Sequence, residues 1–298
     1  MSVDAVIIGG SYAGMAAGLQ LARARRNVVV IDAGEPRNRF AAHSHGFLAQ
    51  DGVPPGEIAA DARSQLMEYP TVEWQAGRVE AVTGQADNFL VVLNNGSTYQ
   101  ARRIILAAGV TDELPSLPGL AGLWGKHVFH CPYCHGYELG KVGIGVLATS
   151  ELAMHHGLML PDWGATTLFL NDAFEPSSEQ LTQLEARGAH IERGAVAQLA
   201  EQSGAGIELM MSDGRKFSLA GLFVAPTLHL GPLVAQLACE LEETPMGCIV
   251  KTDAMQATSI PGIFACGDVA RAGGSVTFAV ADGVMAGLST HRTLMFGL

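Results

Sequence analysis

Residues 3–14 read VDAVIIGGSYAG, a short apolar run that passes directly into a glycine-rich turn. An apolar run of this length, bounded by glycines, is typical of a strand buried in a parallel sheet. The small residues from Ala16 to Arg26 indicate a helix, and Val28 to Ile31 indicate the next strand, with Asp32 at its carboxyl end. The stretch therefore predicts a βαβ unit of the dinucleotide-binding type.

The spacing within the turn supports that interpretation. Gly9 and Gly14 take the first and third glycine positions of the dinucleotide fingerprint, and Ser11 takes the second, where the backbone approaches a pyrophosphate. Serine is small enough for this position, and Asp32 is placed to bind a ribose. A glycine turn in an ordinary α/β protein is the alternative, and it is disfavoured because strand, helix, second strand and acid all occur in order.

The same unit recurs at a shift of 139 residues, which takes Gly9 to Ala148, but its chemistry is altered. Asn171 stands where the ribose-binding acid would be, and Asp172 beside it is the possible substitute. The span between residues 141 and 187 contains no Lys or Arg that could bind a 2′-phosphate. The second copy is expected to keep the fold and to bind NADPH poorly.

Each copy is followed by a predicted β-meander. The first has strands over Phe89–Leu93 and Ile104–Leu106 with an Asn95-Gly96 turn between them. The second has strands over Ile207–Met211 and Leu222–Val224 with an Asp213-Gly214 turn. The first copy also carries additional polar sequence around residues 38–57, for which a solvated connection is the default interpretation.

Clusters of proline and glycine at 114–119 and 226–232 mark two crossings between domains. The predicted fold class is α/β, with two Rossmann-like, three-layer ββα domains, each with a β-meander. The predicted domains are a dinucleotide-binding domain over 1–113 and 230–298 and an inserted domain over 114–229.

Composition narrows the function. The chain has 298 residues and a net charge of −11, so it presents no basic field for nucleic acid. The stretch from Phe217 to Cys239 carries no formal charge, but Pro226, Gly231 and Pro232 interrupt it, so we expect core strands rather than a membrane span. The N-terminus shows no readable signal peptide, and a cytoplasmic location is expected.

The five cysteines are an odd number, which is unlike a secreted disulfide framework. Cys131 and Cys134 form a C-x-x-C pair, which can be a redox dithiol or half of a zinc site. His135 could add a third zinc ligand, but no second C-x-x-C and no clear fourth ligand accompany it, so no metal is predicted. Cys239 and Cys248 are expected to be inert, and Cys266 is expected to have a packing role, with redox sensitivity beside a cofactor as the alternative.

Taken together, these features resemble the low-molecular-weight thioredoxin reductase-like flavoproteins over essentially the whole chain. The shared landmarks occur in order: the glycine turn with Asp32, the run Ala107-Ala108-Gly109, the C-x-x-C pair, and Gly267-Asp268 near the end. The resemblance implies non-covalent FAD. Where members of the family carry Arg-Gln-Ala beside the flavin ring, this chain has Gly274-Ser275-Val276. The implied FAD-binding residues are Gly9, Ser11, Gly14, Asp32, Ala108, Gly267, Asp268, Ser275 and Val276.

Within that family, the altered second copy and the His135 that follows the dithiol are similar to the branch containing gliotoxin-type dithiol oxidases. A neighbouring branch without a pyridine nucleotide site takes electrons from carriers such as ferredoxin. The resemblance implies that Cys134 lies against the flavin and that Cys131 meets the substrate sulfur. His135, expected to titrate near neutral pH, is the first candidate proton carrier, and His45 or His43 the second. Homodimerisation is also implied.

Three hypotheses follow. The leading one is an FAD-dependent thiol–disulfide oxidoreductase that uses Cys131 and Cys134 without NADPH and oxidises a dithiol, with oxygen or another carrier as acceptor. The second is an NAD(P)H- or ferredoxin-dependent reductase of thioredoxin or another disulfide. The third is a non-catalytic flavin and dithiol redox sensor. The expected partner is a small-molecule dithiol or a small redox protein.

Overall fold

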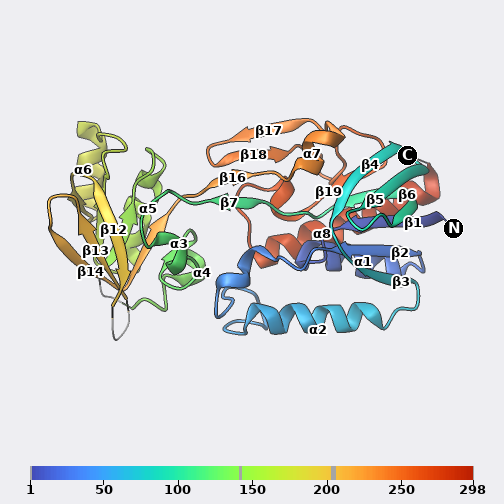
Figure 1. Cartoon of the computed structure of the whole chain (residues 1–298), viewed down its shortest axis with the longest axis horizontal. Coiled ribbons are helices and arrows are strands. Elements are labelled where there is room, and N and C mark those ends of the chain that lie inside the picture. The colour runs from blue at the N-terminus through green and yellow to red at the C-terminus, as the bar shows by residue number, and fades with distance from the viewer. Residues whose placement is uncertain (1, 141–142, 203–205, 298) are drawn as a thin grey trace.

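The computed structural model describes residues 2–140, 143–202 and 206–297. Figure 1 shows two lobes side by side, joined by two neighbouring strands, β7 (Thr111–Glu113) and β16 (Thr227–His229). Both termini lie in the first lobe, and the second lobe is formed by the sequence between the two connecting strands. The α/β class with Rossmann-like parallel sheets is confirmed.

The main sheet of the first lobe has the strand order β3-β2-β1-β6-β5-β4, and β19 pairs with β6. β1 is parallel to β2 and β6, whereas β4, β5 and β6 form an antiparallel meander, as predicted. In sequence order these strands are β1 (Ser2–Ile8), β2 (Val28–Asp32), β3 (Val72–Ala76), β4 (Val79–Gln85), β5 (Asn88–Leu93), β6 (Thr98–Leu106) and β19 (Ile263–Ala265).

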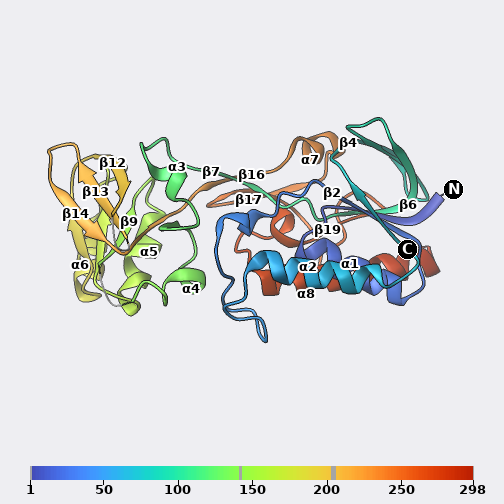
Figure 2. The same cartoon turned by 60° about the horizontal axis from the view of Figure 1, so that its bottom comes forward.

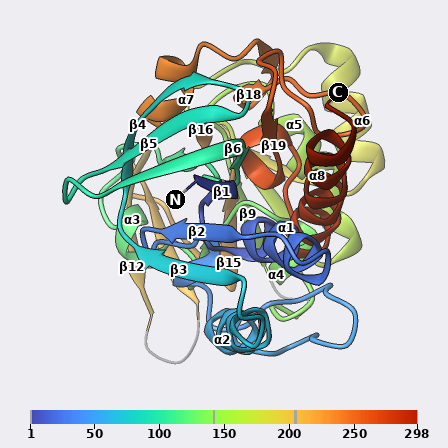
Figure 3. The same cartoon turned by 90° about the vertical axis from the view of Figure 1, so that its right-hand side faces the viewer.

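The helices α1 (Tyr12–Arg23), α2 (Pro55–Met67) and α8 (Val276–Phe296) lie on one side of this lobe (Figures 2 and 3). The prediction that the first helix begins at Ala16 was wrong, because the chain enters the helix directly after Ser11. α1 and α8 pack closely together, with glycine and alanine at their contact. One apolar cluster fills the space between the helices and the sheet, and a second lies on the opposite face.

The second lobe repeats the plan with shorter elements. Its parallel sheet has the order β11-β10-β9-β15-β8, and β12-β13-β14 form a separate meander. The prediction that Leu222–Val224 belongs to the second meander was wrong: the strand is interrupted at Ala220, so that β14 completes the meander and β15 pairs in the parallel sheet. The strands are β8 (Val128–Phe129), β9 (Ile144–Leu147), β10 (Thr166–Phe169), β11 (His190–Glu192), β12 (Val196–Glu201), β13 (Ile207–Met211), β14 (Lys216–Leu219) and β15 (Gly221–Val224).

The helices of the second lobe are short. They are α3 (Leu120–Leu123), α4 (Pro132–His135), α5 (Ala153–Met159), η2 (Leu160–Asp162) and α6 (Ser178–Ala186). A four-stranded sheet, β17-β18-β16-β7, links the lobes. Its remaining strands and the other short elements of the first lobe are η1 (Arg37–Phe40), α7 (Pro232–Leu237), β17 (Leu241–Thr244), β18 (Gly247–Val250) and η3 (Gly267–Ala270).

The uncharged stretch from Phe217 to Cys239 is divided among β14, β15, β16 and α7, as expected for core strands. Within the described residues, no helix is long and apolar enough to cross a bilayer. Cys239 and Cys266 are buried. Burial, with the charge of Asp282 as a second cause, raises the pKa of the Cys266 thiol, which agrees with the expected packing role.

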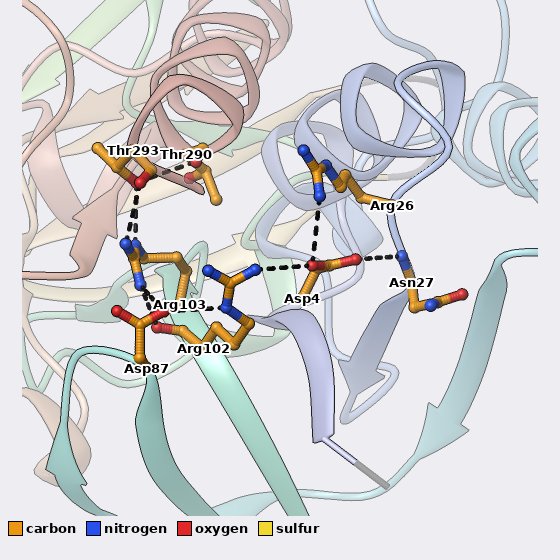
Figure 4. Close-up of polar contacts among 8 residues, drawn as sticks. All are labelled: Asp4, Arg26, Asn27, Asp87, Arg102, Arg103, Thr290 and Thr293. Atoms are coloured by element: carbon orange, nitrogen blue, oxygen red, sulfur yellow. Dashed lines mark hydrogen bonds and ion pairs between the residues drawn. The ribbon is translucent and has the colours of Figure 1, made fainter. Parts of the chain in front are cut away.

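A polar network joins the far end of the main sheet to α8 (Figure 4). The side chain of Arg103 is only 3% exposed, and it donates to Asp87 at 2.9 Å and to the Thr293 hydroxyl at 2.9 Å. Arg102 pairs with the same Asp87 and with Asp4. The network therefore ties β6 to α8 and to the first strand of the sheet.

Candidate active site

The glycine turn after β1 is shaped by close backbone approaches. Gly9 has a φ of +109°, and a Cβ there would lie 2.1 Å from the carbonyl oxygen of Ala107. A Cβ on Gly14 would lie 1.9 Å from the carbonyl oxygen of Gly9. Both positions therefore require glycine. The backbone N–H of Gly10 donates to Oδ1 of Asp32 at 3.1 Å, which fixes the carboxylate beside the turn.

The other residues expected to bind FAD lie at the same edge of the main sheet. Ala108 lies two residues after the end of β6, and Gly267 and Asp268 begin η3, which is separated from the end of β19 by one residue. Ser275 is the N-cap of α8, where its hydroxyl accepts from a backbone N–H in the first turn, and Val276 is the first residue of the helix. The sequence predicted that these segments contribute to one site, and the fold places each at the carboxyl edge or at a helix start.

This edge fits a dinucleotide. The glycine turn leaves no side chain between its backbone and a diphosphate, and Asp32 is already fixed at the end of the second strand, as ribose binding requires. Asp268 lies so close to Gly274 that a Cβ on that glycine would be 2.0 Å from Oδ1. The carboxylate of Asp268 therefore has a fixed position at the mouth of the site.

The corresponding position in the second lobe is occupied differently. The side-chain oxygen of Asn171 accepts from the backbone N–H of Val196 at 2.9 Å, and its amide nitrogen donates to the carbonyl oxygen of Ala148 at 3.3 Å. Both ends of this amide are thus used by the protein's own backbone. The carboxylate of Glu151, which lies in the turn before α5, accepts from Gln180 at 2.5 Å. A diphosphate at this turn would meet a negative charge.

Cys131 and Cys134 form a disulfide at the start of α4, with 5.3 Å between their Cα atoms. Pro132 occupies the first position of the helix, where its missing N–H costs no helical hydrogen bond. Between the cysteines, the side chain of Tyr133 is 74% exposed and packs edge-on against Trp163. The described residues contain no cluster of three or more potential metal ligands.

His135 directly follows the disulfide and stacks on Phe129, with 4.3 Å between the ring centroids. Burial is the main cause that lowers the pKa of His135, to about 4, and the charge of His45 lowers it further. The expectation that this imidazole titrates near neutral pH was therefore wrong. His135 is neutral at pH 7 and can accept a proton.

The loop after η1 brings His45 from the first lobe to the dithiol segment of the second. Nε2 of His45 lies 3.5 Å from the carboxylate of Glu138, and Nδ1 lies 3.6 Å from that of Asp51. The same Asp51 accepts from the backbone N–H of Gly46 at 2.8 Å, which fixes the loop. The additional sequence that the first copy carries is thus a contact between the lobes.

A cavity of about 540 Å³ lies between this loop and the dithiol segment. Its lining includes three predicted histidines, His43, His45 and His135, together with Phe129 and Glu138. The structure therefore brings His43 and His45 of the first lobe to His135, the residue that follows Cys134, although neither cysteine is among the lining residues. The volume falls within the range of sites for small molecules.

Sequence reasoning missed three residues at the junction of the lobes. The guanidinium of Arg37 makes two hydrogen bonds to Asp112, at 2.5 and 2.9 Å. His130 precedes Cys131, and burial, followed by the charge of Arg37, lowers its pKa to about 4. Only the position of His130 beside the C-x-x-C could have indicated it from the sequence, because Arg37 and Asp112 lie in unrelated segments.

His156 on α5 supports the segment before the disulfide. Its Nε2 donates to the carbonyl oxygen of His130 at 3.0 Å, which fixes the tautomer, and Nδ1 is buried without a partner among the described residues. Burial, with the charge of His155 as a lesser cause, lowers the pKa of His156 to about 4. The dithiol is therefore flanked by imidazoles that are neutral at pH 7.

Comparison with known proteins is consistent across the chain. The sequence profile described as pyridine nucleotide-disulphide oxidoreductase matches residues 3–283. The thioredoxin reductase sirT of Leptosphaeria maculans is 32% identical, with 95% of this chain and 92% of that protein covered. The thioredoxin reductase tcpT of Claviceps purpurea is 30% identical, with coverage of 99% and 95%.

Solved structures agree with the fold. An oxidoreductase from Agrobacterium tumefaciens superposes with a TM-score of 0.96 at 52% identity, covering 100% of both chains. The crystal structure of HlmI superposes with a TM-score of 0.92 at 34% identity, covering 99% of this chain and 93% of that one.

Proposed function

This chain belongs to the pyridine nucleotide-disulphide oxidoreductase family, and we propose that it is an FAD-dependent dithiol oxidase that uses Cys131 and Cys134 and does not depend on NADPH. It is an enzyme, a disulfide oxidoreductase of the thioredoxin reductase-like type. The proposal concerns its cofactor, the direction of the reaction (dithiol oxidation and not disulfide reduction) and its electron acceptor.

One observation carries the proposal: the residue at the end of the second strand is available to a ligand in the first copy of the nucleotide-binding unit and is engaged by backbone in the second copy. Asp32 presents a carboxylate beside an open glycine turn, whereas both ends of the Asn171 amide are engaged by backbone. An amide in that state lacks the charge of a carboxylate and has fewer free hydrogen-bonding positions for a ribose, and Glu151 repels a diphosphate. This contrast supports FAD in the first lobe and argues against NADPH in the second.

The dithiol carries out the exchange. A substrate thiolate attacks the sulfur of Cys131, the Cys131–Cys134 bond breaks, and Cys134 leaves as a thiolate. The second substrate thiol then attacks the mixed disulfide, which releases the substrate disulfide and leaves both cysteines reduced. Two protons leave the substrate, and the neutral His135 beside the disulfide accepts the first of them.

Bound FAD would supply a two-electron acceptor that reoxidises the dithiol and passes the electrons to oxygen, giving hydrogen peroxide. The chain's contribution to this step is placement. Asp32, Asp268 and the glycine turn would hold the cofactor, and the contact between His45 and Glu138 keeps the dithiol segment against the first lobe.

The cavity lined by His43, His45 and His135 supports a small-molecule dithiol as the substrate, because its volume of about 540 Å³ suits a small ligand and not a protein. Thioredoxin or another small redox protein is the second candidate, since the relatives sirT and tcpT are named thioredoxin reductases. On that alternative, the exposed Tyr133 between the cysteines would face the partner.

We further propose a cytoplasmic homodimer. The exposed face of α8 carries an apolar stripe that includes Phe278, Leu288 and Phe296, which are 50%, 44% and 65% exposed. These positions recur at helical spacing and therefore share one side of the helix. Sedimentation should give twice the chain mass, and Leu288→Glu should yield monomers; a monomeric wild-type protein would refute the assembly.

The function is tested anaerobically by following flavin absorbance during additions of NADPH, NADH and then a dithiol, before air is admitted. We expect no bleaching by either nucleotide, bleaching by the dithiol, and recovery in air with formation of peroxide. Cys131→Ser should remain yellow and should not bleach. Rapid bleaching by NADPH would make the protein a reductase, and bleaching without recovery in air would require another electron acceptor.

A further inference from the structure

Arg37 is the only residue of the described part of the chain that joins the carboxylates of Asp112 and Asp268. Its Nε and Nη2 donate to Asp112 at 2.9 and 2.5 Å, and its Nη1 donates to Asp268 at 2.8 Å. All three side chains are mostly buried, with 18%, 9% and 19% of their surface exposed. Burial alone would disfavour the charged guanidinium, but the two carboxylates outweigh it and raise the pKa of Arg37.

The three residues come from separate parts of the fold. Arg37 begins η1 in the first lobe, Asp112 lies on the strand β7 that leads to the second lobe, and Asp268 lies in η3 after the last strand of the main sheet. In the opposite direction, the charge of Arg37 reaches His130, the residue before Cys131. This cluster therefore joins the proposed FAD site to the connection between the lobes, and its charge acts on the segment that carries the dithiol.

We infer that Arg37 is a positioning residue that sets FAD binding: it fixes the Asp268 carboxylate and anchors it to the connecting strand through Asp112. This inference rests on the proposed use of FAD. Asp268 is confined between Arg37 on one side and Gly274 on the other, where a Cβ would lie 2.0 Å from Oδ1. A carboxylate held in this way binds a cofactor hydroxyl without first losing side-chain freedom.

Removing the guanidinium has a second effect, because it leaves Asp112 and Asp268 as two carboxylates without their shared cation. Their mutual repulsion favours a neutral acid or a displaced side chain, and both states weaken a contact to a cofactor hydroxyl. A lysine at position 37 keeps the charge but cannot make the two-pronged contact with Asp112 while also reaching Asp268.

The test compares Arg37→Met, Arg37→Lys and Asp112→Asn with Arg39→Met as the matched control. Arg39 lies two residues away, is exposed, and donates only to the backbone oxygen of Pro36 among the described residues. Each apoprotein is reconstituted with FAD, and its affinity is measured from flavin fluorescence. Thermal unfolding of the same apoprotein reports stability separately.

We expect Arg37→Met to raise the Kd for FAD by about tenfold or more, and Arg39→Met by less than about twofold. Arg37→Lys and Asp112→Asn should be intermediate, and Arg37→Met combined with Asp112→Asn should be no weaker than Arg37→Met alone, because the two residues act together. Arg39→Met also removes one positive charge, so a larger Kd for Arg37→Met alone cannot be due to the loss of charge in general. The melting temperatures show separately whether Arg37→Met also destabilises the apoprotein.

Equal FAD affinities for Arg37→Met and Arg39→Met would overturn the inference. If Arg37→Met does not fold, Arg37→Lys and Asp112→Asn decide, and wild-type affinity in both would also overturn it. Failure of the proposed function is recognised by a different experiment, because NADPH would then bleach the flavin of the wild-type protein. That result would leave the Kd values for FAD of the variants, and the inference about Arg37, unaffected.

Discussion

His135 shows how strongly burial alters a single residue. Because its pKa is lowered to about 4, its neutral form dominates above that pH, and this form can accept the substrate proton. The turnover number should therefore show no loss from this imidazole between pH 7 and pH 5, and a loss as the pH approaches 4. A decline centred near pH 6.5 that is absent from His135→Phe would contradict this assignment.

His135→Phe keeps the stacking on Phe129 and removes the proton acceptor. Turnover should fall by about 10²- to 10⁴-fold, the usual contribution of a positioned base, while the flavin spectrum stays unchanged. His190→Phe, at an exposed position outside the cavity, is the control and should stay close to wild type. Steady-state kinetics with one dithiol would separate the two variants.

Arg103 is a buried charged residue whose contacts stabilise the fold. Arg103→Met removes the buried guanidinium that donates to the hydroxyl and to the carbonyl oxygen of Thr293, so we expect the free energy of unfolding to fall by about 2–3 kcal/mol. Arg102 pairs with the same Asp87 from a more exposed position, and Arg102→Met should cost less than about 1 kcal/mol. Urea titrations of the two variants measure the difference, and equal midpoints would refute it.

At the scale of elements, α1 and α8 depend on their glycines. A Cβ on Gly283 would lie 2.1 Å from the carbonyl oxygen of Ala13, so Gly283→Ala forces the two helices apart. The expected loss is about 1–3 kcal/mol, with weaker FAD retention because α1 carries the glycine turn. Gly273→Ala, with nothing within 4 Å of its Cβ, is the control, and similar melting temperatures would disprove the close packing.

Elements of this fold were predictable where the signal is local. The strand over 3–8, the glycine turn and Asp32 follow one another in the sequence, and hydrophobic pattern and glycine spacing are enough to identify them. The break at Ala220 was not predictable, because the pattern of β14 and β15 reads as one apolar run. The separation into two sheets depends on tertiary pairing.

The candidate site divides in the same way. Cys131, Cys134 and His135 are adjacent in the sequence, so their chemistry could be inferred directly. The contact of Arg37 with Asp112 and Asp268 spans 75 and 231 residues, and no local pattern encodes it. The lowered pKa of His135 was equally inaccessible, because it results from burial that only the packed structure defines.

For the whole molecule, the buried histidines make stability depend on pH. In the folded protein the pKa values of His130 and His156 are lowered to about 4. Between pH 6.5 and 4 these histidines are therefore protonated in the unfolded chain and neutral in the folded protein. Their contribution to the free energy of unfolding is fully present above pH 6.5 and is lost as the pH falls towards 4. At pH 5 each histidine should cost about 2 kcal/mol.

Urea midpoints at pH 7 and pH 5 measure this loss. His156→Gln retains a donor for the carbonyl oxygen of His130 but cannot be protonated, so it should show a smaller decrease between the two pH values. His190→Gln, at an exposed position, should decrease like the wild type. A wild-type midpoint that does not change between pH 7 and pH 5 would contradict the prediction.

The connection between the lobes has a consequence for how the protein could evolve. Glu113, where the chain leaves the first lobe, is paired directly with Thr227, where it returns. Two ends that are already neighbours can be joined by a short turn, so the intervening segment behaves as a cassette. Two crossovers, one at each of these positions, could exchange one dithiol-bearing lobe for another while the cofactor-binding lobe keeps its own core and its own main sheet.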